Sequence, residues 1–123
     1  MLKHTQRFID IVNEVKAMIR ETAIVDVQRK LTANNNFYFI DVREESEWQK
    51  GHLPKAIHLS KGVIERDIEK IIPDVNAEII LYCGGGSRSA LAALNLQKMG
   101  YTNIWSMQGG FRGWLEAGFG VTT

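Results

Sequence analysis

The one cysteine of the chain, Cys83, follows an apolar segment that predicts a buried strand, and it begins a glycine-rich loop. The residues of this loop are Gly84, Gly85, Gly86, Ser87, Arg88 and Ser89. Three successive glycines allow the backbone to curl so that its N–H groups point inward toward an anion. The start of the predicted helix after the loop adds further N–H groups, and Arg88 adds a positive charge. Because these features favour a thiolate over a thiol, we predict that Cys83 is a nucleophile surrounded by anion-binding groups.

Two other interpretations of this segment are weaker. A lone cysteine is commonly a small buried apolar residue, but the order of strand, cysteine, glycine-rich loop and helix favours a reactive thiol. A phosphate-binding loop needs the pattern G-x-x-x-x-G-K-[ST], which is missing, and no lysine lies in this loop. A single cysteine also excludes an internal disulfide bond and any metal site with several cysteine ligands. The histidines His4, His52 and His58 lack the spacing of metal ligands, so we predict no metal and no cofactor.

The elements that position this loop are predicted from the pattern of apolar residues. The predicted strands are 23–25, 37–40, 56–59, 78–82 and 103–107. After an amphipathic helix near the N-terminus, the predicted helices are 26–31, 44–50, 63–72, 89–99 and 112–117. Strands that alternate with helices predict an α/β domain with a mostly parallel sheet. Cys83 then lies at the carboxyl end of a strand, where such sheets bind their ligands.

The N-terminal segment, residues 1–20, predicts a helix that extends a single domain of residues 21–123. Apolar residues recur in it at helical spacing, with charges of both signs between them: Phe8, Ile11, Val12, Val15 and Ile19. We expect this helix to pack on the domain, because membrane-surface helices are typically basic; docking of a partner is the alternative. No apolar run is long enough for a signal peptide or a membrane span, so we expect a cytoplasmic protein that binds no membrane.

Length and charge limit the class of function further. A chain of 123 residues with 45% hydrophobic and 24% charged residues is typical of one globular domain. The formal net charge of +1 leaves no broad basic face, so we expect no binding of nucleic acid. A single free thiol fits a reducing compartment.

Three segments in order resemble the rhodanese homology domain, as found in single-domain rhodanese-like sulfurtransferases. The first segment contains Phe39–Arg43, Glu47, Gly51–Pro54 and Ala56; the second is Tyr82–Ser89; the third contains Gly109–Phe111, Trp114, Gly118 and Val121. The resemblance spans residues 23 to 121. It implies a three-layer α/β sandwich with a mostly parallel five-stranded sheet and helices on both faces.

The resemblance also implies a reaction, that of a thiosulfate sulfurtransferase. The Cys83 thiolate attacks the sulfane sulfur of a small donor and keeps it as a persulfide, which the N–H groups of the loop stabilise. An acceptor then removes the sulfur: cyanide in an assay, or a thiol or an acceptor protein in the cell. Because the chain has no second cysteine, this acceptor comes from outside. We expect a monomer or a weak homodimer.

Two related functions are the alternatives. Phosphatases and arsenate reductases of this fold have one more residue between cysteine and arginine than the segment Gly84–Ser87, which separates Cys83 from Arg88. The shorter loop should exclude a phosphoryl group, which is larger than one sulfur atom. The other alternative is a non-catalytic rhodanese-like module for binding or regulation, but many such modules lack the cysteine.

Charged residues outside the loop are expected to shape its surroundings. The resemblance implies that Asp41 and Arg43 make structural polar contacts near the site. Glu47 is acidic where the two-domain thiosulfate enzymes tend to have a basic residue, and Arg88 is the only basic residue of the loop. Doubly charged thiosulfate is therefore not the obvious physiological donor.

Five further residues are expected to have structural positions. We predict that His52 stabilises a turn rather than acting as a base, and that Tyr82 packs at the end of its strand. The resemblance puts Phe111 and Trp114 beside the active-site loop. Lys55 replaces the glycine that is usual in the family, which costs on the order of 1 kcal/mol if its φ is positive.

Overall fold

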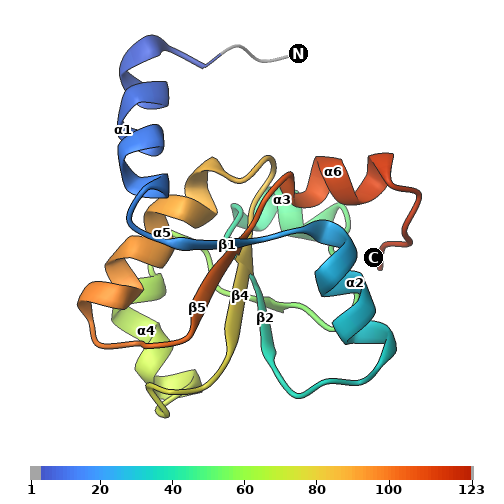
Figure 1. The fold of residues 1–123 in the computed structure, drawn as a ribbon. Coiled ribbons are helices and arrows are strands. Elements are labelled where there is room, and N and C mark those ends of the chain that lie inside the picture. Colours follow the sequence, from blue (N-terminus) through green and yellow to red (C-terminus); the bar gives the residue numbers. More distant parts are fainter. Residues whose placement is uncertain (1–3, 123) are drawn as a thin grey trace.

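Six helices and five strands form the part of the chain that the structure describes. The structure is a computed structural model that describes residues 4–122, and Figure 1 shows the path of its elements. The strands are β1 (Arg20–Thr22), β2 (Tyr38–Asp41), β3 (Ile57–His58), β4 (Ile79–Tyr82) and β5 (Ile104–Met107). The helices are α1 (Gln6–Lys16), α2 (Ile24–Thr32), α3 (Glu45–Gln49), α4 (Ile64–Ile71), α5 (Ser87–Lys98) and α6 (Gly110–Glu116).

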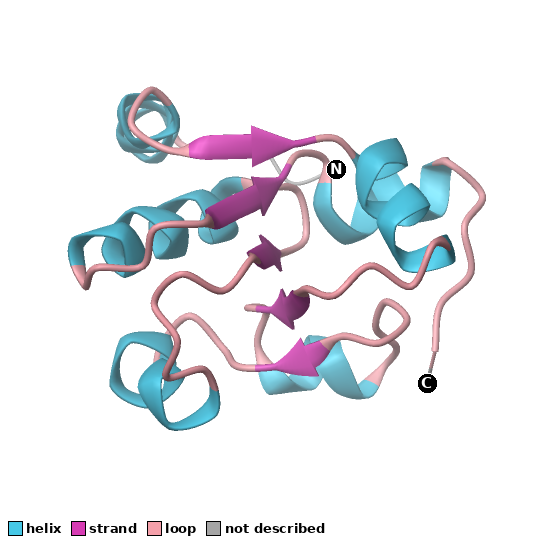
Figure 2. Cartoon of the chain, turned by 60° about the horizontal axis from the view of Figure 1, so that its bottom comes forward, coloured by secondary structure: helices cyan, strands magenta, loops and turns pink. Residues whose placement is uncertain are grey.

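The five strands form one parallel sheet in the order β1-β5-β4-β2-β3. Helices cover both faces of this sheet, as Figure 2 shows. The predicted fold class, a three-layer α/β sandwich with a five-stranded sheet, is confirmed. Because β4 lies in the middle of the sheet between β5 and β2, its carboxyl end is flanked by those of both neighbouring strands.

Alternating side chains along β4 divide the interior into two cores. Ile79, Leu81 and Cys83 belong to the core that is formed with α4 and α5. Ile80 and Tyr82 belong to the opposite core, which is formed with α2 and α6. Cys83 continues the alternation of the strand, and its side chain is therefore on the face that α5 covers.

The first strand lies earlier in the sequence than predicted, so the strand prediction for residues 23–25 is wrong. β1 is Arg20–Thr22, and Ala23 is already the N-cap of α2. β1 is an edge strand that pairs only with β5. Charged residues such as Arg20 and Glu21 are common in strands of this kind, because one edge of the strand faces solvent. The apolar residue Ile24 instead packs beside Gly109 and Gly113, against the start of α6.

Two helices begin earlier than predicted, because a glycine ends the loop before each of them. α5 starts at Ser87 rather than at residue 89, and α6 starts at Gly110 rather than at residue 112. Their N-cap residues, Gly86 and Gly109, have φ values of 109° and 83°. A left-handed backbone of this kind favours glycine.

The N-terminal helix α1 packs against α5 and extends beyond the sheet (Figure 1). Val12 and Val15 of α1 are buried, while Ile11 is half exposed. Residues 1–3 of the predicted helix lie outside the described residues, and the division of the chain after residue 20 stays a prediction. Within residues 4–122, none of the helices combines the length and the apolar character that crossing a membrane requires.

Candidate active site

The sulfur of Cys83 is surrounded by hydrogen-bond donors at the carboxyl end of β4. Sγ accepts hydrogen bonds from the N–H groups of Gly86 at 3.1 Å and Ser89 at 3.3 Å. The Ser89 hydroxyl lies 3.5 Å from the same sulfur. Gly86 is the N-cap of α5 and Ser89 lies in its first turn, where the helix dipole is positive. These groups stabilise negative charge on the buried sulfur.

The three glycines of the loop have different structural roles. Gly86 alone has a positive φ, 109°, which turns the chain into α5. At Gly84, a Cβ would lie 3.0 Å from Nη2 of Arg88 and 3.3 Å from Nη1 of Arg112. At Gly85, a Cβ would collide with Nη2 of Arg112. The missing side chains therefore allow two guanidinium groups to lie against the loop.

A pair of buried hydroxyls lies behind the sulfur. Oγ of Ser89 is 2.8 Å from Oγ of Ser106 on β5, and both residues are fully buried. The hydrogen bond between them fixes the Ser89 hydroxyl beside Cys83. Ser106 is not among the residues predicted from the sequence. The sequence feature that points to Ser106 is that it is a small polar residue within an otherwise apolar strand.

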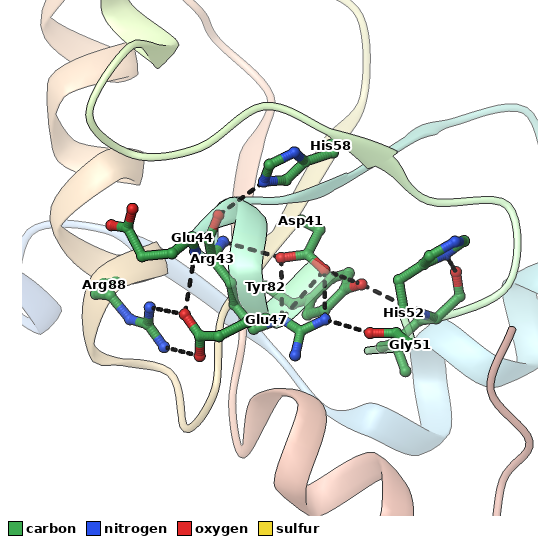
Figure 3. A network of polar contacts seen from close by, with 10 residues as sticks. Asp41, Arg43, Glu44, Glu47, Gly51, His52, His58, Tyr82 and Arg88 are labelled. Carbon is green, nitrogen blue, oxygen red and sulfur yellow. Dashed lines mark hydrogen bonds and ion pairs between the residues drawn. The ribbon is translucent and has the colours of Figure 1, made fainter. Parts of the chain in front are cut away.

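Arg88 is bound by a carboxylate and does not offer a free positive charge to the loop. Its Nη1 and Nη2 donate to Oε1 and Oε2 of Glu47 at 2.7 and 3.1 Å (Figure 3). The hydrogen bonds from Arg88 lower the pKa of Glu47 to about 2, and those same bonds raise the pKa of Arg88. The N–H of Glu44 also donates to Glu47, at 3.0 Å. The positive charge expected of Arg88 is thus largely balanced, by a contact that the sequence does not predict.

Replacing Glu47 with glutamine is expected to cause a loss of stability that depends on pH. The pKa of Glu47, about 2 in the folded chain against 4.5 for an ordinary glutamate side chain, means that ionised Glu47 stabilises the fold above about pH 4.5. This contribution disappears as the pH falls toward 2. Because the side chain is 36% exposed, solvent screens the ion pair, and we expect the variant to lose about 1 kcal/mol or less near neutral pH.

Urea unfolding of the wild-type chain and of Glu47→Gln at a series of pH values measures this difference. The two free energies of unfolding should converge as the solution is acidified from about pH 4.5 toward 2. A gap that stays constant over this range would show that the ionised pair does not stabilise the fold.

A buried polar network joins β2, β4 and the segment after α3 (Figure 3). Asp41, which is fully buried, accepts hydrogen bonds from Nη2 of Arg43 at 2.8 Å and from the Tyr82 hydroxyl at 2.6 Å. Arg43 also donates to the carbonyl of Gly51 at 2.7 Å, and the Tyr82 oxygen accepts from the N–H of Leu53 at 3.0 Å. Burial, together with the charge of Asp41, raises the pKa of Tyr82, so its hydroxyl stays protonated and donates.

The start of α6 packs directly on the active-site loop. The N–H groups of Phe111 and Arg112 donate to the carbonyls of Cys83 at 2.8 Å and Gly84 at 3.0 Å. This approach requires Gly110, because a Cβ at that position would collide with the carbonyl oxygen of Cys83. The centroid of the Phe111 ring also lies 4.1 Å from the guanidinium carbon of Arg43, which belongs to the buried polar network. The C-terminal helix therefore fixes both the loop and the network beneath it.

The remaining residues named from the sequence lie in turns or in the core and do not contact the sulfur of Cys83. The backbone of His52 pairs with Thr122 through two hydrogen bonds of 2.7 Å, and its ring stacks on Trp48 with centroids 3.6 Å apart. Lys55 has a φ of 65°, so the cost on the order of 1 kcal/mol applies to it. Trp114 is buried in the core between the sheet, α2 and α6. Over residues 4–122, no three side chains of His, Cys, Asp or Glu form a group that could hold a metal ion.

The fold and the site together define a parallel α/β domain that holds a single cysteine sulfur against the start of a helix. The chain belongs to the rhodanese-like domain family, whose model matches residues 12–117. In Bacillus subtilis, the putative sulfurtransferase YtwF is 30% identical over 96 residues, which cover 78% of this chain and 90% of YtwF. The putative sulfur carrier protein YrkF of the same organism is 28% identical over 102 residues, or 83% of this chain. Those residues amount to only 54% of the length of YrkF.

Solved structures share the same fold. A Rhodopseudomonas palustris protein of unknown function, described as a possible tyrosine phosphatase, is 25% identical with a TM-score of 0.87 over 99% of both chains. A rhodanese-related protein from Thermoplasma volcanium is 28% identical with a TM-score of 0.71, over 84% of this chain and 97% of that one. The family and its named relatives support sulfur transfer, and they leave the donor and the acceptor to be assigned.

Proposed function

We propose that this chain is a sulfurtransferase that carries sulfane sulfur as a persulfide on Cys83. The observation that supports this most directly is the pair of hydrogen bonds from the N–H groups of Gly86 and Ser89 to Sγ. An inert core cysteine needs no such donors, because a thiol is only a weak acceptor. A thiolate or a persulfide anion is stabilised by them in the way that an oxyanion hole stabilises oxygen.

The reaction consists of two displacements at sulfur. The Cys83 thiolate attacks the outer sulfur of a donor such as thiosulfate, the S–S bond of the donor breaks, and sulfite leaves with the electron pair. A new S–S bond now joins Sγ to the transferred sulfur, which carries the negative charge. The acceptor then attacks this terminal sulfur and restores the thiolate. With cyanide the product is thiocyanate, and with a thiolate it is a new persulfide.

The acceptor is an external nucleophile, because the chain contains one cysteine and cannot form an internal disulfide bond. A small thiol or an acceptor protein has the required chemistry. The relatives named as a putative sulfurtransferase and a putative sulfur carrier support this sulfur-handling role. A thiol that must stay reduced between turnovers fits a reducing compartment such as the cytoplasm.

Phosphoryl transfer is the less well supported alternative. An arginine that binds a phosphoryl group needs its guanidinium free to donate to the phosphoryl oxygens. Arg88 donates instead to both carboxylate oxygens of Glu47. The donors at the sulfur itself lie 3.1 and 3.3 Å from Sγ, a spacing that suits one anionic sulfur.

Intact-protein mass spectrometry tests the proposal. The reduced wild-type chain is incubated in turn with thiosulfate, mercaptopyruvate and inorganic polysulfide, and then with cyanide. We expect a gain of about 32 Da, one sulfur atom, with at least one donor, and its removal by cyanide. If none of the donors adds sulfur, the proposed persulfide chemistry is wrong and the binding module becomes the better interpretation.

A further inference from the structure

Ser106 of β5 lies behind the sulfur of Cys83 and is separated from it by one other hydroxyl. In the sheet, Ser106 pairs with Leu81 of β4, which lies two residues before Cys83 and therefore on the same face. Oγ of Ser106 is 2.8 Å from Oγ of Ser89, which is itself 3.5 Å from Sγ. Both serines are fully buried. The two hydroxyls thus form a short chain that ends at the sulfur.

Each hydroxyl of this chain has one proton to donate, so the chain has two alternative directions. If Ser106 donates to Ser89, the Ser89 proton points to Sγ and both protons have an acceptor. If Ser89 donates to Ser106, the Ser106 proton needs a different acceptor. Within residues 4–122, the one hydrogen bond found for the Ser106 hydroxyl is that with Ser89. Because a buried hydroxyl without an acceptor is costly, the favoured direction runs from Ser106 through Ser89 to the sulfur.

We propose that Ser106 is a positioning residue that directs the Ser89 hydroxyl toward Sγ and so stabilises the thiolate of Cys83. This inference rests on the proposed sulfur transfer, in which the thiolate attacks the donor and later leaves from the persulfide. A thiol is a weak acceptor, whereas hydrogen bonds to an anion are strong, so a proton held toward Sγ favours the anion. The backbone fixes the N–H donors of Gly86 and Ser89, but a hydroxyl rotates unless a second group fixes it.

The charged side chains on the elements around the two hydroxyls also influence the sulfur. By element, they are Lys16 on α1, Glu21 on β1, Glu47 on α3, Arg88 on α5 and Arg112 on α6. Substitutions at the two serines leave all of these charges in place. A difference between such variants therefore measures the effect of the hydroxyls.

The pH profile of alkylation by iodoacetamide, a neutral reagent, tests this role without any sulfur donor. Ser106→Ala should weaken the stabilisation of the thiolate about fivefold, as expected for one net hydrogen bond, and so raise the midpoint of the profile by about 0.7 pH units. A less stabilised thiolate is also about twofold more nucleophilic. We therefore expect alkylation about twofold slower than in the wild type below the midpoint and about twofold faster above it. A merely structural defect would change the rate in the same direction at every pH.

A double-mutant cycle tests whether Ser106 acts through Ser89. Adding Ser106→Ala to Ser89→Ala should leave the midpoint where Ser89→Ala alone puts it, because the hydroxyl that Ser106 directs is then absent. The N–H donor of residue 89 belongs to the backbone and is retained in both variants.

Two further comparisons separate the hydroxyl of Ser106 from its packing. Ser106→Thr and Ser106→Val have nearly the same shape, but only threonine keeps a hydroxyl, so only the valine variant should raise the midpoint. Tyr101→Phe is the matched control, because it removes another buried hydroxyl of the same core, which donates to the carbonyl of Ile72 at 2.6 Å. It should leave the alkylation profile unchanged.

The release of sulfur to cyanide gives a second readout. The Cys83 thiolate is the leaving group in this step, and a less stabilised thiolate leaves more slowly, so Ser106→Ala loaded with sulfur should release it about twofold more slowly. An unchanged midpoint in Ser106→Ala, a further shift on the Ser89→Ala background, or equal midpoints in the threonine and valine variants would overturn the proposal. Failure of the wild-type chain to take up sulfur would instead refute the proposed function, and the alkylation profiles would still decide whether Ser106 directs the Ser89 hydroxyl.

Discussion

Cys83→Ala is expected to gain no sulfur from any donor and to form no thiocyanate, whereas the wild-type chain gains about 32 Da and loses it to cyanide. The reason is that Cys83 carries the only thiol of the chain, so that no other side chain can form the persulfide. The loop donors, Gly86 and Ser89, are still present in the variant, but they have no sulfur to stabilise. Intact mass and a colorimetric thiocyanate assay measure the two steps separately.

The comparison with the wild-type chain is informative only if Cys83→Ala folds. Alanine is close in size to cysteine, and Cys83 contributes one buried side chain to the core with α4 and α5, so thermal melting should show a cooperative transition close to that of the wild type. A well-folded Cys83→Ala chain that still produced thiocyanate would locate the sulfur chemistry elsewhere. That result would overturn the assignment of the nucleophile.

Asp41→Ala is expected to lower the free energy of unfolding by about 3–5 kcal/mol, the largest loss of stability among the variants considered. Asp41 has no exposed surface, and its carboxylate accepts from Arg43 and from Tyr82. Removing it leaves the Arg43 guanidinium buried without its counter-charge and the Tyr82 hydroxyl without its acceptor. Urea denaturation near neutral pH measures this loss.

Asp67→Ala is the matched control, because Asp67 also pairs with an arginine but does so at the surface of α4. Exposed pairs contribute little, so this variant should remain close to the wild type in stability. If the two substitutions lowered the free energy of unfolding equally, burial would not be the source of the Asp41 effect. The network would then be incidental to the fold.

The local features of the site are predictable from the sequence. The strand predicted over residues 78–82 is found as β4 (Ile79–Tyr82), whose side chains are apolar on both faces of the sheet, and Cys83 follows it at the carboxyl end. The glycines and the helix after them are also local signals, although the position of Gly86 as the N-cap of α5 becomes clear only in the structure. The prediction of β1 is wrong because an edge strand of polar residues has no pattern of apolar residues that distinguishes it from a loop.

Contacts between distant segments are the part that the sequence does not predict. Glu47 pairs with Arg88 although 41 positions separate them, and this pairing largely balances the positive charge that the loop is expected to receive from Arg88. Arg112 lies against Gly85 only because α6 docks there. Ser106 meets Ser89 because β5 is paired with β4. Each contact depends on the completed sheet, and no local pattern of residues encodes it.

The packing of α6 on the loop makes the backbone around Cys83 depend on a segment that is synthesised much later than the cysteine itself. The carbonyls of Cys83 and Gly84 are bound by the N–H groups of Phe111 and Arg112, which leave the ribosome after the whole of β4 and α5. A nascent chain that has reached only Gly110 contains the cysteine and its glycines, but it lacks the hydrogen bonds that fix their backbone. We therefore expect the loop around Cys83 to take its final form only after α6 has been synthesised and has docked on it.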